Sequence, residues 1–418
     1  MRLLHTSDWH LGHTLHDLPR DHEHGQFLAW LMEQIAALEV DALLIAGDIF
    51  DTSNPPAAAQ TMWYRFLAKA RRRFPELDIV VIGGNHDSPA RLDAPEALLS
   101  DLGVRVIGGL PRDRHGRLDP DRLLAPLTGR AGEVAAWVCA VPYLRTADLP
   151  PPPTDGEDPL IAGVRAVYAE ALELVRTRRQ PGQAIVAMGH CYMVGGDISD
   201  LSERRILGGN QHALPADIFA PEVAYAALGH LHKAQRIGGR DHVRYCGSPI
   251  PLSLSETNYH HQVCLVDLDG ERMSGLDIVR IPRFTEILRV PEGGPEPLSA
   301  VLSQLRALPA SDPTQPEGAR PFLEVRVQLD RPEPKANRQI VEALDGKDAR
   351  LIKITPSYQA QGREILLGAG VRTLVDLQEA DVFRAIYAKG YGDDPPAELM
   401  AAFHDLLEEV RGGEAVTQ

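Results

Sequence analysis

Cysteine is scarce in this sequence. The 418 residues include four cysteines, Cys139, Cys191, Cys246 and Cys264. Each lies in an apolar, strand-like run and none has C-x-x-C spacing, which is the pattern of reduced thiols in a protein core. The sequence therefore does not indicate a disulfide framework or a zinc knuckle with thiolate ligands.

Long hydrophobic runs are also absent. No uninterrupted apolar stretch approaches the roughly 20 residues that a membrane-spanning helix needs. The apolar start at residues 1–4 is followed at once by His5 and Asp8, and it is too short for the hydrophobic region of a signal peptide. We therefore expect a cytoplasmic protein with no membrane-bound part.

The sequence has no excess of positive charge. The 43 Lys and Arg residues are outnumbered by 58 Asp and Glu residues, so the formal net charge is -15. This balance argues against a protein that holds nucleic acid by overall positive charge. A site with bound divalent cations and a few Arg or Lys residues could still hold a phosphate, because such cations are often the largest local charges.

The overall composition is that of an ordinary globular protein, with 44% hydrophobic and 24% charged residues. Its length predicts two or three domains. The first part of the chain alternates between strands and helices, with strands expected at 42–46 and 79–82, and helices at 25–38, 57–73 and 94–102. This alternation predicts an α/β domain in which helices cover the faces of a sheet.

The middle of the chain continues this pattern less regularly. We expect a polar surface loop or hairpin at 111–127, a strand at 134–141, a proline-rich linker at 150–153 and a helix at 160–178. The stretch 197–214 is polar and contains glycine, and a loop of this length in a compact domain is often functional.

The pattern changes near Pro282. A small α+β unit is predicted by strands at 284–290, 322–329 and 350–355, and by helices at 298–308 and 335–344. The stretch 373–410 contains two amphipathic helical segments on either side of a proline pair. We therefore expect three regions: an α/β domain at 1–281, an α+β domain at 282–370 and a helical pair at 371–418.

Five apolar strands are followed by side chains that can bind metals. The first motif is Asp8-Trp9-His10, where two-residue spacing at a strand end turns both side chains the same way. Four later strands end in Gly-Asp, Gly-Asn-His-Asp, Gly-His and Gly-His-Leu-His. The candidate ligands from all five motifs are Asp8, His10, Asp48, Asn85, His190, His230 and His232.

This set of candidate ligands is too large for one four-coordinate site, and it fits two metal ions that share a bridging carboxylate. The ligands are nitrogen and oxygen atoms without a thiolate, which suits Mn, Fe or Zn better than Mg. Two neighbouring cations can clamp phosphate oxygens during an in-line displacement. The predicted reaction is therefore hydrolysis of a phosphate ester.

The order of these motifs over residues 8–232 resembles that of the calcineurin-like metallophosphoesterases. The segments HTSDWHLG (5–12), GDIFDT (47–52), GNHDS (84–88) and VRYCGSPIPL (243–252) are similar to the SbcD family, the nuclease subunits of bacterial SbcCD complexes. The resemblance implies an α/β sandwich of two mixed β-sheets flanked by helices, a small α+β capping domain that binds DNA, and a C-terminal helical pair.

The resemblance also implies a role for each ligand. One metal would be held by Asp8, His10 and His232. The other would be held by Asn85, His190 and His230. Asp48 would bridge the two ions, for which Mn²⁺ is the expected metal.

Beside the metals, the resemblance implies that His86 stabilises the pentacoordinate phosphate or protonates the leaving 3′ oxygen. Asp87 would orient the His86 ring. Archaeal relatives carry a second active-site histidine just after the Gly-Asp motif, where this chain has Asp51. An ionised Asp51 cannot do the work of a cationic imidazole.

The family further implies DNA as substrate, a 3′ to 5′ exonuclease activity on duplex ends and an endonuclease activity on single strands or hairpins. It implies docking of the helical pair 371–418 on an SbcC-type ATPase, and a homodimer that makes a heterotetramer with SbcC. The candidate dimer contacts are Met62, Trp63, Phe66, Leu67, Leu98 and Leu99, although the pattern alone favours Trp63 and Phe66 as core residues.

Other polar residues have less specific surroundings. Arg204 and Arg205 could contact DNA phosphates or could be a solvated pair of charges. Lys233, next to the metal-binding histidines, is a better candidate for a phosphate contact. Four histidines lack the strand-glycine context and are expected to be solvated loop residues: His13, His16, His22 and His24.

Three functions are compatible with the sequence. The first is a metal-dependent DNA nuclease acting in DNA repair, recombination and replication. The second is a phosphatase or nucleotide phosphodiesterase for small substrates, which the acidic net charge favours. The third is a scaffold whose metal site is vestigial, although the complete set of candidate ligands argues against it.

Overall fold

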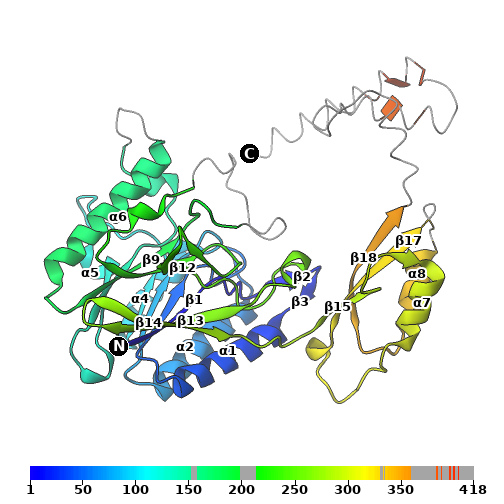
Figure 1. Cartoon of the computed structure of the whole chain (residues 1–418), viewed down its shortest axis with the longest axis horizontal. Helices are drawn as coiled ribbons and strands as arrows, with labels where there is room; N and C mark the ends of the chain where they lie inside the picture. The colour runs from blue at the N-terminus through cyan, green and yellow to red at the C-terminus, as the bar shows by residue number, and fades with distance from the viewer. Residues whose placement is uncertain are drawn as a thin grey trace. The chain divides into compact units, whose positions relative to one another are not determined.

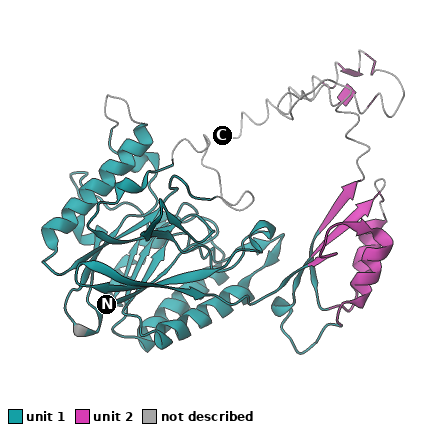
Figure 2. Ribbon diagram, in the orientation of Figure 1, with its two compact units in different colours: residues 1–288, 310–323, 348–353 teal, residues 289–309, 324–347, 354–418 magenta. Residues whose placement is uncertain are grey.

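The computed structural model describes residues 1–151, 158–197, 213–329, 333 and 335–358, and farther on residues 383, 384, 387, 395, 396, 399, 400 and 403. Arg204, Arg205 and most of the predicted helical pair at 371–418 lie outside the described residues. The chain divides into two compact units (Figure 2). Unit 1 comprises residues 1–288, 310–323 and 348–353, and unit 2 comprises residues 289–309, 324–347 and 354–418.

Unit 1 contains two six-stranded sheets (Figure 1). The first has the order β14-β13-β1-β4-β5-β6, with β1 (Arg2–Thr6), β4 (Ala42–Ala46), β5 (Asp78–Ile82), β6 (Val104–Ile107), β13 (Gln262–Asp269) and β14 (Arg272–Arg280). The second has the order β11-β12-β10-β9-β8-β7, with β7 (Leu124–Leu127), β8 (Ala136–Ala140), β9 (Ala184–His190), β10 (Val223–Gly229), β11 (Gln235–Ile237) and β12 (Arg240–Tyr245). Both sheets are mixed, because parallel central strands are joined to antiparallel strands.

The helices of unit 1 are α1 (Asp21–Ala37), α2 (Ala57–Arg73), α3 (Pro89–Asp93), α4 (Glu96–Asp101), α5 (Pro120–Leu123) and α6 (Pro159–Arg178). The short elements are the β2 (Thr14–Leu15) and β3 (Leu18–Pro19) hairpin and the 3-10 turns η1 (Gly129–Ala131), η2 (Thr146–Asp148), η4 (Ala216–Ile218), η5 (Leu254–Glu256) and η6 (Glu317–Ala319). None of the described helices has the length and apolar character needed to cross a membrane.

The two sheets pack face to face, with helices outside. In β4, Leu43 and Ile45 face a core shared with α1 and α2, whereas Leu44 and Ala46 face the second sheet. This alternation follows from the two-residue period of a strand, and it explains why β4 is apolar at every position. The outer face of the second sheet packs on α6, whose Tyr168 is fully buried. The predicted α/β sandwich with helices on both sides is confirmed.

An aromatic cluster joins α2 to the loop that follows β1. The ring of Trp9 contacts Trp63 and Phe66 edge to face, at centroid distances of 5.6 Å and 5.3 Å. The indole nitrogen of Trp9 donates a hydrogen bond to the Thr6 hydroxyl at 2.9 Å. Because Trp9 stands between Asp8 and His10, this cluster positions the first motif.

We expect Trp63→Ala to lower the free energy of unfolding by about 3–5 kcal/mol, since Trp63 is 1% exposed and its removal leaves a cavity against Trp9. Urea unfolding followed by circular dichroism measures the change. Val194→Ala is the control, because Val194 is 54% exposed and its truncation should cost less than about 0.5 kcal/mol. Equal losses for the two variants would contradict the assigned core.

Several predicted elements agree with the structure, and others differ for identifiable reasons. The strand at 42–46 and the helix at 57–73 are confirmed as β4 and α2. Helix α1 begins four residues earlier than predicted, because the acidic first turn favours the helix N-terminus and Arg20 pairs with Glu23 inside the protein. His24 is consequently buried, and the expectation that it is solvated is wrong.

Residues 111–127 also differ from the prediction, which was a surface loop. The second half of this stretch forms α5 and β7, and β7 extends the second sheet beside β8. Leu123, Leu124 and Leu127 are buried, so the apolar residues in this stretch decide its position despite its polar start.

A small α+β region follows, and most of its described residues belong to unit 2. The third sheet has the order β15-β17-β16 with β18 paired to β17, and the elements are β15 (Ile287–Val290), β16 (Glu296–Pro297), α7 (Leu298–Ala307), β17 (Phe322–Leu329), α8 (Ala336–Ala343) and β18 (Arg350–Tyr358). The buried residues of α8 are Ala336, Ile340 and Ala343, which share one helical face. The predicted helices at 298–308 and 335–344 correspond to α7 and α8.

Candidate metal centre

The candidate ligands follow strands whose carboxyl ends are neighbours. β1, β4 and β5 are parallel, and so are β9 and β10. The first two loops are joined by backbone hydrogen bonds of 3.0 Å from Asp8 to Gly47 and from His10 to Asp48. These backbone hydrogen bonds alone hold the first two motifs next to each other.

Four of the candidate ligands have a left-handed backbone. The φ angles are 54° at Asp8, 46° at His10, 49° at Asp48 and 106° at His230. Non-glycine residues rarely adopt this region, and such residues concentrate at functional sites, where the surrounding structure holds them in place.

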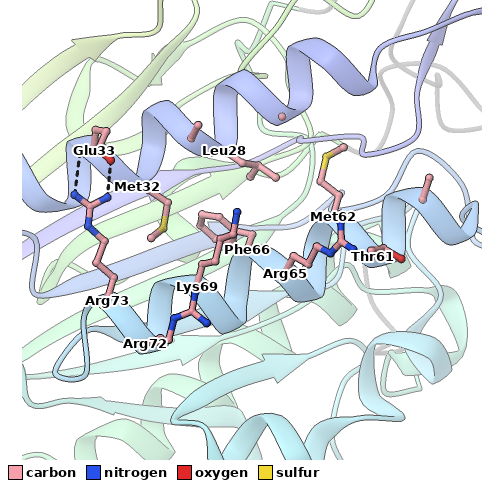
Figure 3. Close-up of a pocket in the computed structure, with 13 residues that line it drawn as sticks. Leu28, Met32, Glu33, Thr61, Met62, Arg65, Phe66, Lys69, Arg72 and Arg73 are labelled. Atoms are coloured by element: carbon pink, nitrogen blue, oxygen red, sulfur yellow. Dashed lines mark hydrogen bonds and ion pairs between the residues drawn. The ribbon is translucent and has the colours of Figure 1, made fainter.

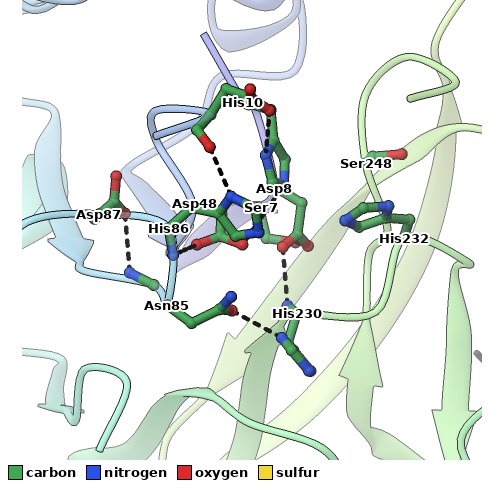
Figure 4. Close-up of polar contacts among 12 residues, drawn as sticks. Ser7, Asp8, His10, Asp48, Asn85, His86, Asp87, His230, His232 and Ser248 are labelled. Atoms are coloured by element: carbon green, nitrogen blue, oxygen red, sulfur yellow. Dashed lines mark hydrogen bonds and ion pairs between the residues drawn. The ribbon is translucent and has the colours of Figure 1, made fainter. Parts of the chain in front are cut away.

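Asp48 lies at the middle of the site (Figure 4). Its Oδ2 atom is 3.3 Å from Nε2 of His190 and 3.5 Å from Nε2 of His10. Its Oδ1 atom accepts a 2.9 Å hydrogen bond from the backbone N–H of His86. One carboxylate therefore faces ligands from two different loops, which is the arrangement that a bridging ligand requires.

The other candidate ligands gather on the two sides of Asp48. Potential donor atoms of Asp8, His10 and His232 lie within 4.8 Å of one another, as do those of Asp8, Asp48 and His190. Oδ1 of Asn85 is 2.9 Å from Nε2 of His190 and 3.0 Å from Nδ1 of His230. All seven predicted ligands thus belong to one connected cluster.

Asp8 is itself held in place by hydrogen bonds. Its Oδ1 atom accepts the backbone N–H of His230 at 2.9 Å, and its Oδ2 atom accepts the Ser7 hydroxyl at 2.5 Å. The bond from His230 connects the last motif to the first one, and the bond from Ser7 fixes Asp8 within the first motif.

Three imidazole rings are oriented by oxygen atoms on their far side. Nδ1 of His190 donates to the Ala46 carbonyl at 2.9 Å, and Nδ1 of His10 lies 3.3 Å from Oδ1 of Asp51. Nδ1 of His232 lies 2.9 Å from Oε1 of Glu256. With Nδ1 engaged in this way, Nε2 is the candidate ligand atom of each ring, in the orientation that is usual for metal-binding histidines.

The donor set fits a divalent cation. Nε2 of His10 is buried and has no hydrogen-bond partner among the residues that the structure describes. Burying a nitrogen lone pair against carboxylates without a partner raises the free energy of the folded state. A bound metal ion would provide the missing partner. The residues could therefore hold divalent ions through nitrogen and oxygen atoms.

Charge at this site is set by burial and by the carboxylates. Burial lowers the pKa of His190, but the charge of Asp48 and the hydrogen bond to it outweigh burial and raise this pKa to about 9. Burial raises the pKa of Asp48, but His190 and His10 hold it well below its ordinary value. Burial, together with the charge of His190, lowers the pKa of His230 to about 3. A divalent cation would take the place of the His190 proton as the partner of Asp48.

Glu256 is a functional candidate that the sequence did not reveal. It is fully buried, and its second oxygen accepts the backbone N–H of Leu252 at 2.7 Å. A lone glutamate in a Ser-rich turn, 24 residues after His232, carries no local sign of this contact.

We expect Glu256→Gln to weaken the affinity of the centre for Mn²⁺ by about 10- to 100-fold, because the His232 ring loses its charged partner. Calorimetric titration of the metal-free protein with Mn²⁺ measures this change. Glu170→Gln serves as the control, since Glu170 lies on α6 and accepts a weak 3.4 Å bond from Leu118. An unchanged Mn²⁺ isotherm for Glu256→Gln would show that Glu256 does not support a ligand.

The side chain of Asp87 has different partners from those expected. Its carboxylate accepts backbone N–H groups of Ile49, Phe50 and Gly84 at 3.1, 3.0 and 2.9 Å. Burial and the charge of Asp48 raise its pKa to about 6. Asp87 therefore ties the loops after β4 and β5 together.

The His86 ring is oriented by a main-chain oxygen. Nδ1 of His86 donates to the carbonyl of Asp51 at 2.6 Å. The carboxylate of Asp51 faces His10, and its carbonyl faces His86. Asp51 is therefore in contact with both His10 and His86.

Position 84 has no room for a side chain, because Asp48 lies directly against Gly84. A Cβ atom at this position would overlap the backbone nitrogen and carboxylate of Asp48. The absence of a side chain allows the loop after β5 to approach the carboxylate of Asp48.

Lys233 forms an ion pair with Asp197 at 2.5 Å, and its side chain is 44% exposed. The Asp197 hydrogen bond raises the pKa of Lys233. Its expected contact with DNA phosphates stays a prediction.

Comparisons with known proteins agree with the order of the motifs. Residues 1–234 match the calcineurin-like phosphoesterase family, and residues 283–391 match the family described as type 5 capsule protein repressor C-terminal domain. The SbcD component of the SbcCD nuclease of Rhodobacter capsulatus is 44% identical over 361 residues, which cover 85% of this chain and 87% of that protein. The resemblance predicted from the motifs is confirmed.

Two further relatives carry the same name. The SbcD protein of Escherichia coli K12 is 32% identical, with 99% of this chain and 99% of its own length covered. The SbcD protein of Bacillus subtilis is 37% identical, with 99% of this chain and 100% of its own length covered.

Proposed function

Because this chain belongs to the calcineurin-like phosphoesterases, and among them to the SbcD family of SbcCD nucleases, we propose that it is the nuclease subunit of such a complex. It is a hydrolase of phosphodiesters, and its family implies divalent metal ions. The observation that carries the proposal is the position of Asp48, which faces His190 on one side and His10 on the other.

We propose that Asp8, His10 and His232 hold one ion and that Asn85, His190 and His230 hold the other. Asp48 contributes to both. The mixed nitrogen and oxygen ligands support Mn²⁺ as the physiological ion. Bound at these residues, two divalent cations would supply Lewis-acid stabilisation of the charge that develops on the phosphate.

His86 is the proposed catalytic residue of the chain. Because Nδ1 is engaged by the Asp51 carbonyl, Nε2 is the ring atom that would act on the substrate. A proton on Nε2 can hydrogen-bond the phosphate oxygens or pass to the leaving 3′ oxygen as its bond to phosphorus breaks. Water adds the new oxygen to phosphorus, and the products are a 5′-phosphate and a 3′-hydroxyl.

The proposed partners are DNA and an SbcC-type ATPase, with the segment 371–418 as the docking element. This segment lies largely outside the described residues. The support for the proposal is therefore the amphipathic pattern of its sequence. The finer activities that we propose are 3′ to 5′ exonuclease action on duplex ends and endonuclease action on single strands or hairpins.

We also propose a homodimer, with a narrower set of contacts than expected. Trp63, Phe66, Leu67 and Leu99 are at most 3% exposed and belong to the core of the protomer. Leu98 and Met62 are the candidates that can reach a partner. Met62 lines a groove of about 870 Å³ between α1 and α2, whose rim carries Arg65, Lys69, Arg72 and Arg73 (Figure 3).

The proposed nuclease function is tested with end-labelled duplex, single-stranded and hairpin DNA. The protein is incubated alone and with an SbcC-type ATPase, in Mn²⁺, Mg²⁺ or Zn²⁺. Release of nucleotides from the duplex end in Mn²⁺ is the expected result. Turnover of only p-nitrophenyl phosphate or cyclic nucleotides would instead identify a phosphatase for small substrates, and a stable complex without any hydrolysis would identify a scaffold. Sedimentation equilibrium measures the dimer.

A further inference from the structure

A small pocket lies directly beside the proposed metal centre. Its walls include Tyr143, Arg145, Tyr168, His190, Tyr192 and Leu214. His190 belongs to both sites, since its ring lines this pocket and its Nε2 atom faces Asp48 and Asn85. A molecule in the pocket would therefore be adjacent to a phosphate at the metal centre.

Tyr143 is held firmly in the wall of this pocket. Its backbone N–H donates to the Gly83 carbonyl at 2.8 Å, which ties its loop to the loop that carries Asn85. Its ring meets the His190 ring edge to face, with 6.2 Å between centroids. The guanidinium of Arg145 lies 5.4 Å from the Tyr143 centroid, and its Nη2 donates to the Asp87 carbonyl at 3.1 Å. The aromatic surface is thus fixed relative to the metal centre.

The size and the chemistry of the pocket indicate its ligand. A volume of about 120 Å³ is close to that of the roughly 150 Å³ cavity known to hold benzene, so it accommodates a six-membered aromatic ring. Aromatic side chains bind flat, conjugated rings by stacking, and the positive charge of Arg145 suits the phosphate that a nucleotide carries beside its base. Tyr143 and Tyr192 are only half-buried, so the ring can enter from solvent.

We propose that this pocket, named here the Tyr143 pocket, binds an unpaired nucleobase of the DNA strand next to the scissile phosphate. The proposal rests on the proposed nuclease function. A base inside a duplex is stacked on both faces, so only an unpaired or extruded base can enter a side pocket. The Tyr143 pocket would then make the enzyme select frayed ends and single strands.

The first test replaces one nucleoside of a labelled single strand with tetrahydrofuran, which lacks a base, at successive positions around one phosphodiester. We expect one position at which wild-type cleavage of the adjacent bond falls by about 5- to 100-fold, the range of base-stacking contributions. Tyr143→Ala should cleave the intact and the abasic strands at similar rates. Tyr143→Phe should retain the wild-type preference, because its ring still stacks.

Two further variants test whether a lost preference results from poor folding or from the removal of any tyrosine. Tyr143→Leu keeps apolar bulk and should lose the preference even if Tyr143→Ala folds poorly. Tyr64→Ala removes a half-buried tyrosine from α2, outside the pocket, and should retain the preference. The proposal is overturned if Tyr143→Leu shows the same abasic penalty as the wild type, or if the wild type shows no penalty at any position.

A binding measurement separates the Tyr143 pocket from the proposed function. The same strand carries 2-aminopurine directly beside the sensitive position, or at each position in turn, and its fluorescence is followed in EDTA, where no hydrolysis occurs. The 2-aminopurine fluorescence rises when the neighbouring base leaves the stack. A fluorescence change with the wild type and Tyr143→Phe that is lost in Tyr143→Leu supports the pocket. If the wild type fails to cleave any DNA, the nuclease proposal fails, while this measurement still decides whether the pocket binds a base.

Discussion

Asp48→Asn is expected to abolish phosphodiester hydrolysis, with a loss of more than about 1,000-fold in kcat/KM. The substitution removes the negative charge that faces both proposed metal sites, and each cation is worth several kcal/mol of charge stabilisation in the transition state. The geometry makes Asp48 the most sensitive position, since its Oδ2 atom lies between His190 and His10. Hydrolysis of labelled single-stranded DNA in Mn²⁺ measures the loss, and calorimetry measures Mn²⁺ binding.

The same strand provides a matched control for this substitution. Asp41 stands just before β4, as Asp48 stands just after it, and its carboxylate accepts the Arg2 backbone N–H at 2.7 Å. Asp41→Asn should therefore leave hydrolysis within about twofold of the wild type, because Asp41 stands at the opposite end of β4 from the proposed metal centre. Asp48→Asn with normal Mn²⁺ binding and normal hydrolysis would refute the proposed metal centre.

His86→Ala is expected to lower kcat by about 100- to 10,000-fold while the protein still binds two Mn²⁺ ions. The size of the loss is that of a general acid or of a charged hydrogen-bond donor. Metal binding should persist because Asp48 is held by the backbone N–H of His86, which alanine keeps. Metal content after gel filtration and single-turnover hydrolysis separate the two effects.

The structure also defines the result that would contradict this role. Donor atoms of His10, Asp48 and His86 lie within 4.8 Å of one another, so His86 could itself be a ligand. Loss of one Mn²⁺ ion from His86→Ala would assign His86 to the metal centre and remove it from proton transfer. His242→Ala is the control, since His242 is a half-buried histidine on β12. It should change neither metal content nor rate.

Much of the nuclease domain could be predicted because its signals are local. Buried strands such as β4 are continuous apolar runs, and the two-residue period of a strand requires this when both faces are covered. In four of the five motifs a glycine and a candidate ligand are neighbours in sequence at the strand end, so their order was visible without coordinates. Parallel strands then bring their carboxyl ends to one edge, which is why the cluster of seven candidate ligands was predictable.

The first and last residues of helices and strands were harder to predict where polar residues lie nearby. The start of α1 depends on the Arg20–Glu23 pair, and Arg20 also donates a hydrogen bond to the Pro251 carbonyl. A residue 231 positions away therefore contributes to where this helix begins. Likewise β7 is a strand because β8 lies beside it, and its own sequence is too short to specify that pairing.

The sequence by itself determined the sandwich, the order of the metal-capable residues and the family. Only the tertiary structure decided which groups support them: Glu256 behind His232, Asp51 between His10 and His86, Asp87 on backbone amides, and Tyr143 against His190. The physical reason is that strand and helix periodicity acts over a few residues, whereas these contacts join side chains whose separation is set by the packing of whole layers.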